Sequence, residues 1–470
     1  MVQTNKIEEI IDSLPPKFYS RLRLLTGMGP FTDGLEELFA SVGILAAEFL
    51  YHPSTVVIAA MLGAYMMGVG FGAFIMGWIG DVVGRRTIFI LDALLIGIFS
   101  LWSAFTYTEL TYFMSRLLLG LAIGGDYSVA LPLLSEYSPV KKEHKKMSRG
   151  SSLSFVSLLF MIGTVVGSTI GVVLELTIGL VLAMRVAFII GAIPGFVLFF
   201  LRLDIPESLR WAVENGRKDV AKNIMAFFRK KHSYKRGDET YVNENFNYGK
   251  KNTYKSAIKN YFNKKNIRPV LYLMFMVSMY SFGVNYLGLY GAILYKELGA
   301  TSVESLVIVT IGYTGGTLGT LIPVFWIDKL GRVKTAIFGF IFSAIIMVIY
   351  LVLEFTKTLT LLDMFIIDPV FLFVILGLVR TMAWVPSSEF GGAKSRGISQ
   401  GWTKLWEFPT AFPAYILYGL LGVFFGGLFA LMAIIAGIIL VAIFGVETTG
   451  KTLEAIEAEE KSGLYTTAGK

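Results

Sequence analysis

Nine charged residues interrupt long apolar segments of this chain, and they are the residues best placed to do chemistry. They are Asp33, Glu36, Glu37, Asp92, Arg116 and Asp126 in the first half of the chain and Arg380, Lys404 and Glu407 in the second. In lipid, a charge at the centre of a helix costs at least roughly 2.5–3.5 kcal/mol on insertion scales. These residues are therefore expected to face an internal cavity and to have partners there.

The carboxyl group of Asp33 is the strongest candidate for reversible proton binding. A carboxyl buried between helices gains a proton more easily because its charged form loses hydration, and a nearby arginine opposes this effect. If Arg116 approaches Asp33 in only some conformations, Asp33 can load a proton on one side of the membrane and release it on the other. The alternative is a static ion pair. Adjacent Glu36 and Glu37 point about 100° apart on a helix, so they cannot both face the cavity.

The cations of the second half point to a different chemistry. Arg380 precedes Trp384 by four residues and Lys404 precedes Glu407 by three, so each pair shares one helical face. Two cations on a cavity wall suit a carboxylate or phosphate, which arginine can hold through two parallel hydrogen bonds. The alternative is internal neutralisation, of Lys404 by Glu407 and of Arg380 by a first-half acid.

The elements that must position these charges are transmembrane helices. The mean hydropathy is +0.64, 54% of residues are hydrophobic and 16% are charged, which excludes an ordinary soluble domain of this length. Stretches of about 20 apolar residues are long enough to span a bilayer as helices. Twelve such stretches are predicted, at 24–49, 54–79, 87–107, 110–134, 151–174, 181–203, 268–295, 303–327, 333–355, 366–390, 398–420 and 423–445. The predicted fold class is an all-α membrane protein with two six-helix halves.

The placement of Lys and Arg predicts the orientation in the membrane. The net charge is +8, but the basic residues gather in alternate loops, in a central linker and in the C-terminal tail. This asymmetry follows the positive-inside rule, so both termini and the linker are expected in the cytoplasm, and a nucleic-acid partner is not expected. One helix is predicted over 206–230 and a second, short helix near 253–263. The predicted segments are 1–23 (N-terminal segment), 24–205 (first half), 206–267 (linker), 268–446 (second half) and 447–470 (tail).

Metal, redox and enzyme sites are not expected. The chain has no cysteine, and its three histidines show no ligand spacing. No cofactor is predicted. The segment from Gly445 to Thr452 fits the P-loop pattern, but a membrane helix rather than a strand is predicted before it, so the match is read as a coincidence.

Charged phrases recur at the same spacing in the two halves. Gly77-Trp-Ile-Gly-Asp81-Val-Val-Gly84-Arg85-Arg86 is echoed by Asp328-Lys-Leu-Gly331-Arg332, and Arg149-Gly150 is echoed by Arg396-Gly397. Such duplication is typical of transporters with parallel halves. The first phrase resembles the loop signature of the major facilitator superfamily. This resemblance implies ion pairs that hold the cytoplasmic side shut. The residues assigned to this predicted cytoplasmic gate are Asp81, Gly84, Arg85, Arg86, Glu136, Arg149, Glu207, Arg210, Asp328, Gly331, Arg332, Glu389, Arg396 and Glu447.

Further phrases narrow the resemblance to two related groups. Arg116-x3-Gly120-x3-Gly124, Pro206-Glu-Ser-Leu-Arg210-Trp211, Trp384-x4-Glu389 and Glu447-x6-Glu454 resemble markers of the sugar porter family. Phe31-Thr-Asp33-x3-Glu37-Leu-Phe39 and Gly124-Gly-Asp126-Tyr127 resemble the phosphate:proton symporters instead. The resemblance implies that Asp33 and Arg116 form a proton-coupling pair and that Asp126 also handles protons.

Departures from the sugar porter pattern concern the predicted solute site. Met279 and Tyr280 occupy the positions of two glutamines in sugar porters, and Ser157 occupies the position of a third glutamine. The absence of these amides speaks against a hexose. Phosphate symporters have an aspartate near the position of Asn285. The residues assigned to the solute site are Tyr127, Ser157, Asn285, Tyr290, Arg380, Trp384, Lys404 and Glu407.

The sequence thus predicts a transporter of the cell membrane that moves a sugar, phosphate or organic acid by proton symport. Its expected partners are the lipid bilayer, a small-molecule solute and protons, and it is expected to act as a monomer. The alternatives are a proton-independent sugar facilitator and a transporter-like nutrient sensor. The short tail speaks against the sensor.

Overall fold

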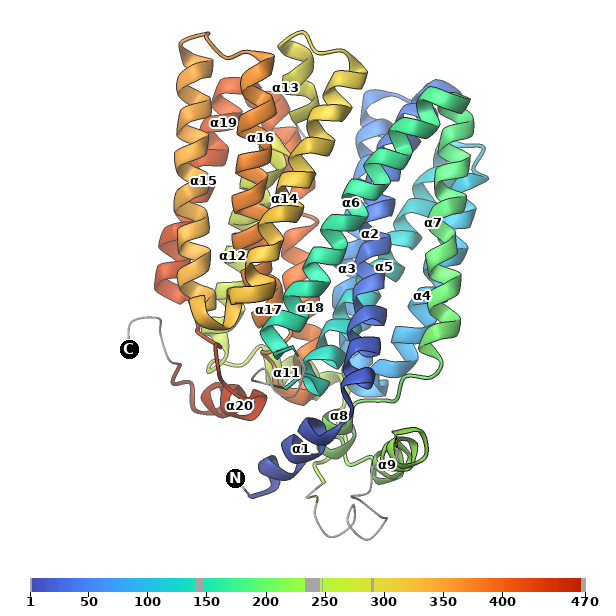
Figure 1. Ribbon diagram of the computed structural model, residues 1–470, viewed down its shortest axis with the longest axis vertical. Coiled ribbons are helices and arrows are strands. Elements are labelled where there is room, and N and C mark those ends of the chain that lie inside the picture. The colour runs from blue at the N-terminus through green and yellow to red at the C-terminus, as the bar shows by residue number, and fades with distance from the viewer. Residues whose placement is uncertain (1, 140–146, 233–245, 247, 289–290, 466–470) are drawn as a thin grey trace.

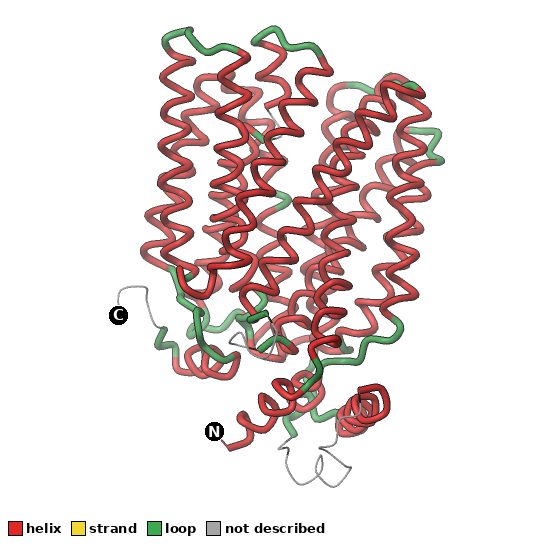
Figure 2. The backbone as a smooth tube through the Cα atoms, viewed as in Figure 1, coloured by secondary structure: helices red, strands yellow, loops and turns green. Residues whose placement is uncertain are grey.

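The computed structural model describes residues 2–139, 147–232, 246, 248–288 and 291–465. Within these ranges every regular element is a helix, and the helices form two bundles that lie side by side (Figures 1 and 2). We call the bundle of residues 16–202 the first half and the bundle of residues 267–444 the second half.

The first half consists of six long helices. These are α2 (Pro16–Tyr51), α3 (Thr55–Val83), α4 (Arg85–Ala104), α5 (Glu109–Tyr137), α6 (Arg149–Ile178) and α7 (Leu180–Arg202). Several helices begin where the sequence supplies an N-cap. Ser54 before α3 and Thr108 before α5 each accept a hydrogen bond from a backbone N–H of the first turn. Local sequence therefore determines where these helices start.

The second half is built from more and shorter pieces. These are α12 (Ile267–Leu287), α13 (Gly291–Glu297), α14 (Ser302–Leu330), α15 (Arg332–Phe355), α16 (Leu361–Val374), η1 (Ile375–Arg380), α17 (Thr381–Ser387), α18 (Gly392–Glu407) and α19 (Ala411–Phe444). The predicted span 268–295 is divided between α12 and α13. The predicted span 398–420 is divided between α18 and α19. The predicted break after residue 420 is a kink inside α19, where Gly422 has a φ of 72°.

The tenth predicted span, 366–390, contains a π-helical segment. Six residues, Ile375–Arg380, form η1 between α16 and α17. A π-helical turn widens the helix and is common at functional sites. Here the segment ends on Arg380, one of the two predicted anion-binding cations.

Ten helical stretches of the described residues are long and apolar enough to cross a membrane on their own. Helix α2 is not one of them, since Asp33, Glu36 and Glu37 lie in its middle. Helix α18 has 16 residues, fewer than the roughly 20 that a span requires. Both of these bundle helices carry predicted site residues.

Short helices gather at one end of the two bundles, together with both termini (Figure 1). We call this end of the molecule the linker end. The helices there are α1 (Val2–Ser13), α8 (Leu209–Glu214), α9 (Lys218–His232), α11 (Tyr254–Tyr261) and α20 (Leu453–Ser462). The single helix expected over 206–230 is wrong, because Gly216, with a φ of 67°, separates α8 from α9. The five-segment division of the chain stays a prediction.

Glycines allow close packing of helix backbones within the first half. A Cβ atom on Gly120 of α5 would lie 2.3 Å from the carbonyl oxygen of Tyr65 on α3, and one on Gly124 would lie 2.2 Å from that of Val69. Small residues permit such approaches between membrane helices. Between the halves, α3 packs against α18 and α6 packs against α14.

We expect Gly124→Ala to destabilise the first half. The added methyl meets backbone atoms that cannot rotate away, and overpacking of this kind costs about 1–3 kcal/mol. Gly171→Ala is the matched control, because its methyl would meet only the end of the Val42 side chain, at 3.1 Å. Thermal unfolding in detergent should show a lower midpoint for Gly124→Ala than for Gly171→Ala. Equal midpoints would contradict close packing of α3 on α5.

Candidate functional site

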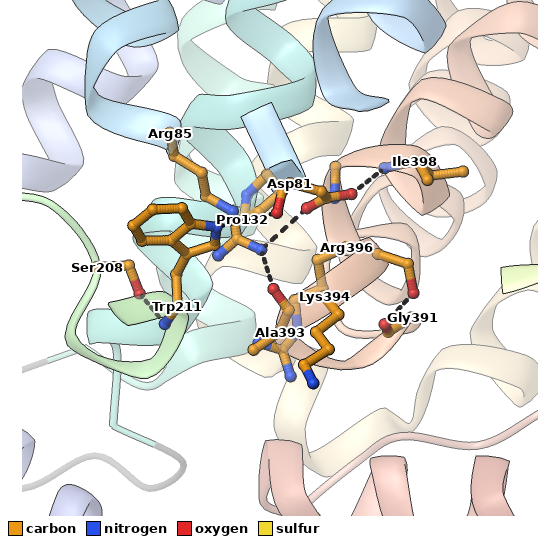
Figure 3. A network of polar contacts seen from close by, with 12 residues as sticks. Asp81, Arg85, Pro132, Ser208, Trp211, Gly391, Ala393, Lys394, Arg396 and Ile398 are labelled. Carbon is orange, nitrogen blue, oxygen red and sulfur yellow. Dashed lines mark hydrogen bonds and ion pairs between the residues drawn. The ribbon is translucent and has the colours of Figure 1, made fainter. Parts of the chain in front are cut away.

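Asp81 at the end of α3 joins the first half to the second. Its carboxylate accepts hydrogen bonds from the backbone N–H groups of Gly397, at 3.0 Å, and Ile398, at 2.9 Å (Figure 3). Arg85 donates to Asp81 at 3.3 Å and to the carbonyl oxygen of Ala393 at 3.1 Å. Helix α18 bends at Ser395, so Gly397 lies in the first turn of its regular part. Asp81 therefore occupies a helix N-terminus of the opposite half, where negative charge is stabilised.

Four arginines and two glutamates cross the same interface. Glu136 of α5 contacts Arg85 of its own half and Arg396 of the second half, the latter at 2.6 Å. In reverse, Glu389 of the second half pairs with Arg149 of α6 at 2.7 Å and with Arg332 at 3.6 Å. We call these six residues the linker-end ion pairs. All six are almost fully buried.

The repeated glutamates Glu207 and Glu447 act within their own halves. Glu207 accepts a hydrogen bond from the backbone N–H of Arg86 at 3.0 Å, and Glu447 accepts one from that of Arg332 at 3.1 Å. Each thus caps the helix that follows a turn at a positive-φ glycine, Gly84 or Gly331. Burial raises the pKa of Glu207.

Two predicted gate residues lie at the margin of this network. Arg210 of α8 pairs with Glu454 of α20 at 3.3 Å and lies 3.9 Å from Glu8 of α1. Asp328 accepts a hydrogen bond from Ser148, the residue before α6. Asp328 therefore bridges to the start of a first-half helix, as Asp81 bridges to α18 in the second half.

Asp33 is fully buried in α2 and faces two phenols. Tyr65 donates a hydrogen bond to one carboxyl oxygen, and Tyr127 donates to the other at 2.6 Å. Arg116 instead pairs with Glu36, at 2.9 Å, and its guanidinium lies 4.6 Å from the centre of the Tyr65 ring. In this conformation the predicted Asp33–Arg116 pair is not formed. No ion pair with Asp33 is found among the described residues.

Glu37 and Arg380 line a small central cavity between the halves, with a volume of about 60 Å³. Phe160 also contributes to its wall from the first half, and Asn285 from the second. Glu36 points the other way, toward Arg116. As expected from their adjacency, only one of the two glutamates reaches the cavity.

Glu407 accepts hydrogen bonds from three donors on the second-half side of the cavity. Lys404 Nζ and Trp384 Nε1 each donate to Oε2 at 2.8 Å, and Arg380 Nε donates to Oε1 at 3.3 Å. The predicted neutralisation of Lys404 by Glu407 is present. Arg380 is neutralised by the same glutamate rather than by a first-half acid.

Aromatic rings enclose both cations. The Arg380 guanidinium lies between the rings of Phe160 and Trp384, 3.8 and 3.9 Å from their centres. Lys404 Nζ lies 3.2 Å from the centre of a Trp384 ring and 4.1 Å from that of Tyr127. Ring faces stabilise cations, most strongly where water is excluded. Tyr127 thus contacts Asp33 through its hydroxyl and the second-half cation through its face.

A second buried charge cluster lies in the first half. Arg202, at the end of α7, donates to Asp126 at 2.6 Å and to Asp92 at 3.2 Å. It also donates to backbone oxygens of Phe89 and Leu25. Arg202 was not among the residues predicted from the sequence, although it lies inside the predicted sixth span. Asp126 thus has a fixed partner, and Asp92 shares it.

The other predicted solute-site residues are dispersed. Ser157 forms a hydrogen bond with Thr381 across the halves at 3.3 Å. Asn285 lies on the cavity wall. Tyr290 lies outside the described residues. Asp368, buried in α16, was also missed, although it interrupts an apolar run within the predicted tenth span.

Nearly the whole chain matches a known family of transporters. The family model described as "Sugar (and other) transporter" matches residues 26–459. The chain belongs to this family. Membership confirms the resemblance drawn from the charged phrases and places the chain among transporters rather than enzymes.

Curated relatives are distant in sequence. The chain is 25% identical over 447 residues to the arabinose-proton symporter of Bacillus subtilis (strain 168), covering 92% of each chain. It is 25% identical to the probable inorganic phosphate transporter 1-8 of Arabidopsis thaliana, over 70% of this chain and 67% of that protein. It is 23% identical to the putative metabolite transport protein YaaU of Escherichia coli (strain K12), but the match spans only 66% of that relative's length. Sugar and phosphate transporters thus both occur among the relatives.

Solved structures share the fold. The proton:xylose symporter XylE of the major facilitator superfamily, bound to 6-bromo-6-deoxy-D-glucose, superposes with a TM-score of 0.77 at 17% identity, covering 94% of this chain and 99% of that chain. XylE from E. coli in a partially occluded inward-open conformation gives a TM-score of 0.70. The predicted fold class, twelve membrane helices in two halves, is confirmed.

We expect Arg396→Met to loosen the linker-end contact between the halves. It leaves Glu136 with a partner from its own half only, whereas Arg86→Met removes bonds that stay within the first half. The chain has no cysteine, and Ser388 is fully buried. A cysteine introduced by Ser388→Cys therefore reacts with a thiol reagent only when the two halves separate. Maleimide labelling of Ser388→Cys should be several-fold faster with Arg396→Met than with Arg86→Met. Equal rates would show that the Arg396–Glu136 pair does not hold the halves together.

Proposed function

We propose that this protein is a secondary active transporter that moves a small oxyanion, a phosphate or a carboxylate, together with protons by alternating access. One observation carries the proposal. Tyr127 joins a buried first-half carboxyl, Asp33, to the Trp384 and Lys404 cluster of the second half. A change in the charge of Asp33 therefore alters the electrostatic potential on both sides of the interface where a solute would bind.

Asp33 is suited to gain and lose a proton. Both of its hydrogen-bond donors are neutral phenols, so protonation of Asp33 breaks no ion pair. We assign proton coupling to Asp33. Arg116 and Asp126, which have fixed partners here, support the helices around it.

The charge balance at the cavity supports an anionic solute. With Asp33 and Glu37 protonated, the remaining charges are Arg380 and Lys404 against Glu407, a net positive set. Arg380 Nη1 contacts Met161 Sδ at 3.4 Å, a weak acceptor that a phosphate or carboxylate oxygen could replace. Proton loading and anion binding would therefore favour each other.

The cavity must enlarge for transport. Its volume of about 60 Å³ is well below the roughly 300–1,000 Å³ of ligand sites. The linker-end ion pairs bind the halves together on one side of it. We propose that these pairs break when the solute site opens toward the linker end, which the positive-inside rule assigns to the cytoplasm. The protein would then lie in the cell membrane, act as a monomer and need no cofactor.

A second candidate function is facilitated transport of a neutral sugar without protons. It is favoured by Glu407, which already engages both Arg380 and Lys404. The name of the arabinose-proton symporter relative is consistent with a sugar as solute. In this case Asp33 would serve only to hold Tyr65 and Tyr127.

We expect Asp33→Asn to abolish concentrative uptake while exchange continues. The amide keeps a similar shape but cannot exchange a proton between states. Proteoliposomes loaded for counterflow and proteoliposomes under an inward proton gradient measure the two activities separately. Asp363→Asn, at the exposed start of α16, is the matched control. Concentrative uptake that survives Asp33→Asn would favour the facilitator.

We expect Arg380→Ala to weaken binding of phosphate or a short carboxylate by about tenfold or more, since a charge-assisted bond contributes roughly 1.5–3 kcal/mol. Binding of a pentose or hexose, if any, should change little. Calorimetric titration of the purified protein with each solute measures both. Arg185→Ala is the control, because Arg185 stacks on Tyr107 away from the cavity. A sugar that binds and depends on Arg380, with no anion binding, would overturn the anionic assignment.

A further inference from the structure

A second carboxyl without a cation lies in the other half of the molecule. Asp368 sits in α16, and its side chain is 1% exposed. Neither carboxyl oxygen has a well-aligned hydrogen bond within the described part of the chain, and no ion pair to it is found there. It is packed directly on α14, because a Cβ atom on Gly312 would lie 2.1 Å from Asp368 Oδ2.

The titratable neighbours of Asp368 are phenols. Tyr295 of α13 interacts with its carboxyl while also donating to the carbonyl oxygen of Leu287 at 3.4 Å. Tyr313 of α14 interacts electrostatically with both Asp368 and Glu37. Tyr350 of α15 interacts electrostatically with Tyr295. Phenols ionise only near pH 10 in water, so Asp368 is the most acidic member of this group.

An ionised Asp368 would be unstable in this packing. An isolated carboxylate removed from water costs far more than a hydrogen bond, and such a group becomes neutral or draws in water. The element best able to yield is α13, because it is short and joins the second half chiefly through α14 and α12. It lies at the end of the molecule opposite the linker end (Figure 1).

We propose that Asp368 is a proton-binding site of the second half and that loss of its proton releases α13 from α14 and α16. The proposal rests on the proposed proton coupling, to which it adds a second carrier on the side away from the linker. Tyr313, which also lines the central cavity, connects this site with Glu37. Protonation of Asp368 would close α13 over the solute site, and release of the proton would open it.

Cysteine labelling tests the site without any solute. Leu294 of α13 is 2% exposed, and Glu297 at the end of the same helix is exposed, so each is replaced by cysteine in the naturally cysteine-free chain. The maleimide rate at Leu294→Cys is divided by the rate at Glu297→Cys, which removes the intrinsic pH dependence of thiols. From about pH 5.5 to about pH 8.5, the ratio should rise several-fold. With Asp368→Asn, it should stay at its low-pH value.

Asp363→Asn is the matched control, since it makes the same change five residues earlier in α16 at a solvent-facing helix start. It should leave the pH dependence intact. Size-exclusion chromatography confirms that each variant is folded. The proposal fails if the ratio does not change with pH in the parent, or if it changes equally with Asp368→Asn. Because no solute is used, these outcomes do not depend on whether Asp33 couples transport.

Discussion

The structure depends on one constraint, which is that every charge buried away from water must be compensated. In the bilayer each buried ion needs a partner inside the protein, because no solvent can compensate it. Arg116 with Glu36 and Arg202 with Asp126 satisfy this need within the first half. At the linker end the partners come from opposite halves. The requirement that fixes single helices therefore also holds the two bundles together.

Duplication makes this contact between the halves nearly symmetric. Arg149 reaches Glu389, and its repeat Arg396 reaches Glu136, so each half supplies the cation for the other's acid. Buried ion pairs stabilise little on balance, since desolvation offsets much of their attraction. Breaking them during a conformational change, with water entering as the halves separate, thus costs less than disrupting an apolar core of the same size. Such pairs suit an interface that must open repeatedly.

The sequence predicted those features that depend on local or repeated signals. The charged phrases identified the family and the residues of the linker-end contact, because turns, caps and charges repeat in both halves. It could not predict that Arg116 would pair with Glu36 rather than with Asp33, since the two acids lie about one helical turn apart and their local sequence does not distinguish them. The π-helical η1 has no local sequence signal. Arg202 and Asp368 are charged residues inside predicted apolar spans, so the sequence alone could have identified them as candidates.

Four buried acids of this protein fall into two chemical classes, and the difference bears on function. Glu36 and Asp126 each face an arginine, so protonating them would leave a buried cation uncompensated. Asp33 and Asp368 face tyrosines, which stay neutral and can donate a hydrogen bond to a carboxylate or accept one from a carboxylic acid. An acid of the second class can change its charge without breaking an ion pair. We propose that proton handling lies with Asp33 in the first half and Asp368 in the second, and that the acid–arginine pairs form the frame against which these acids work.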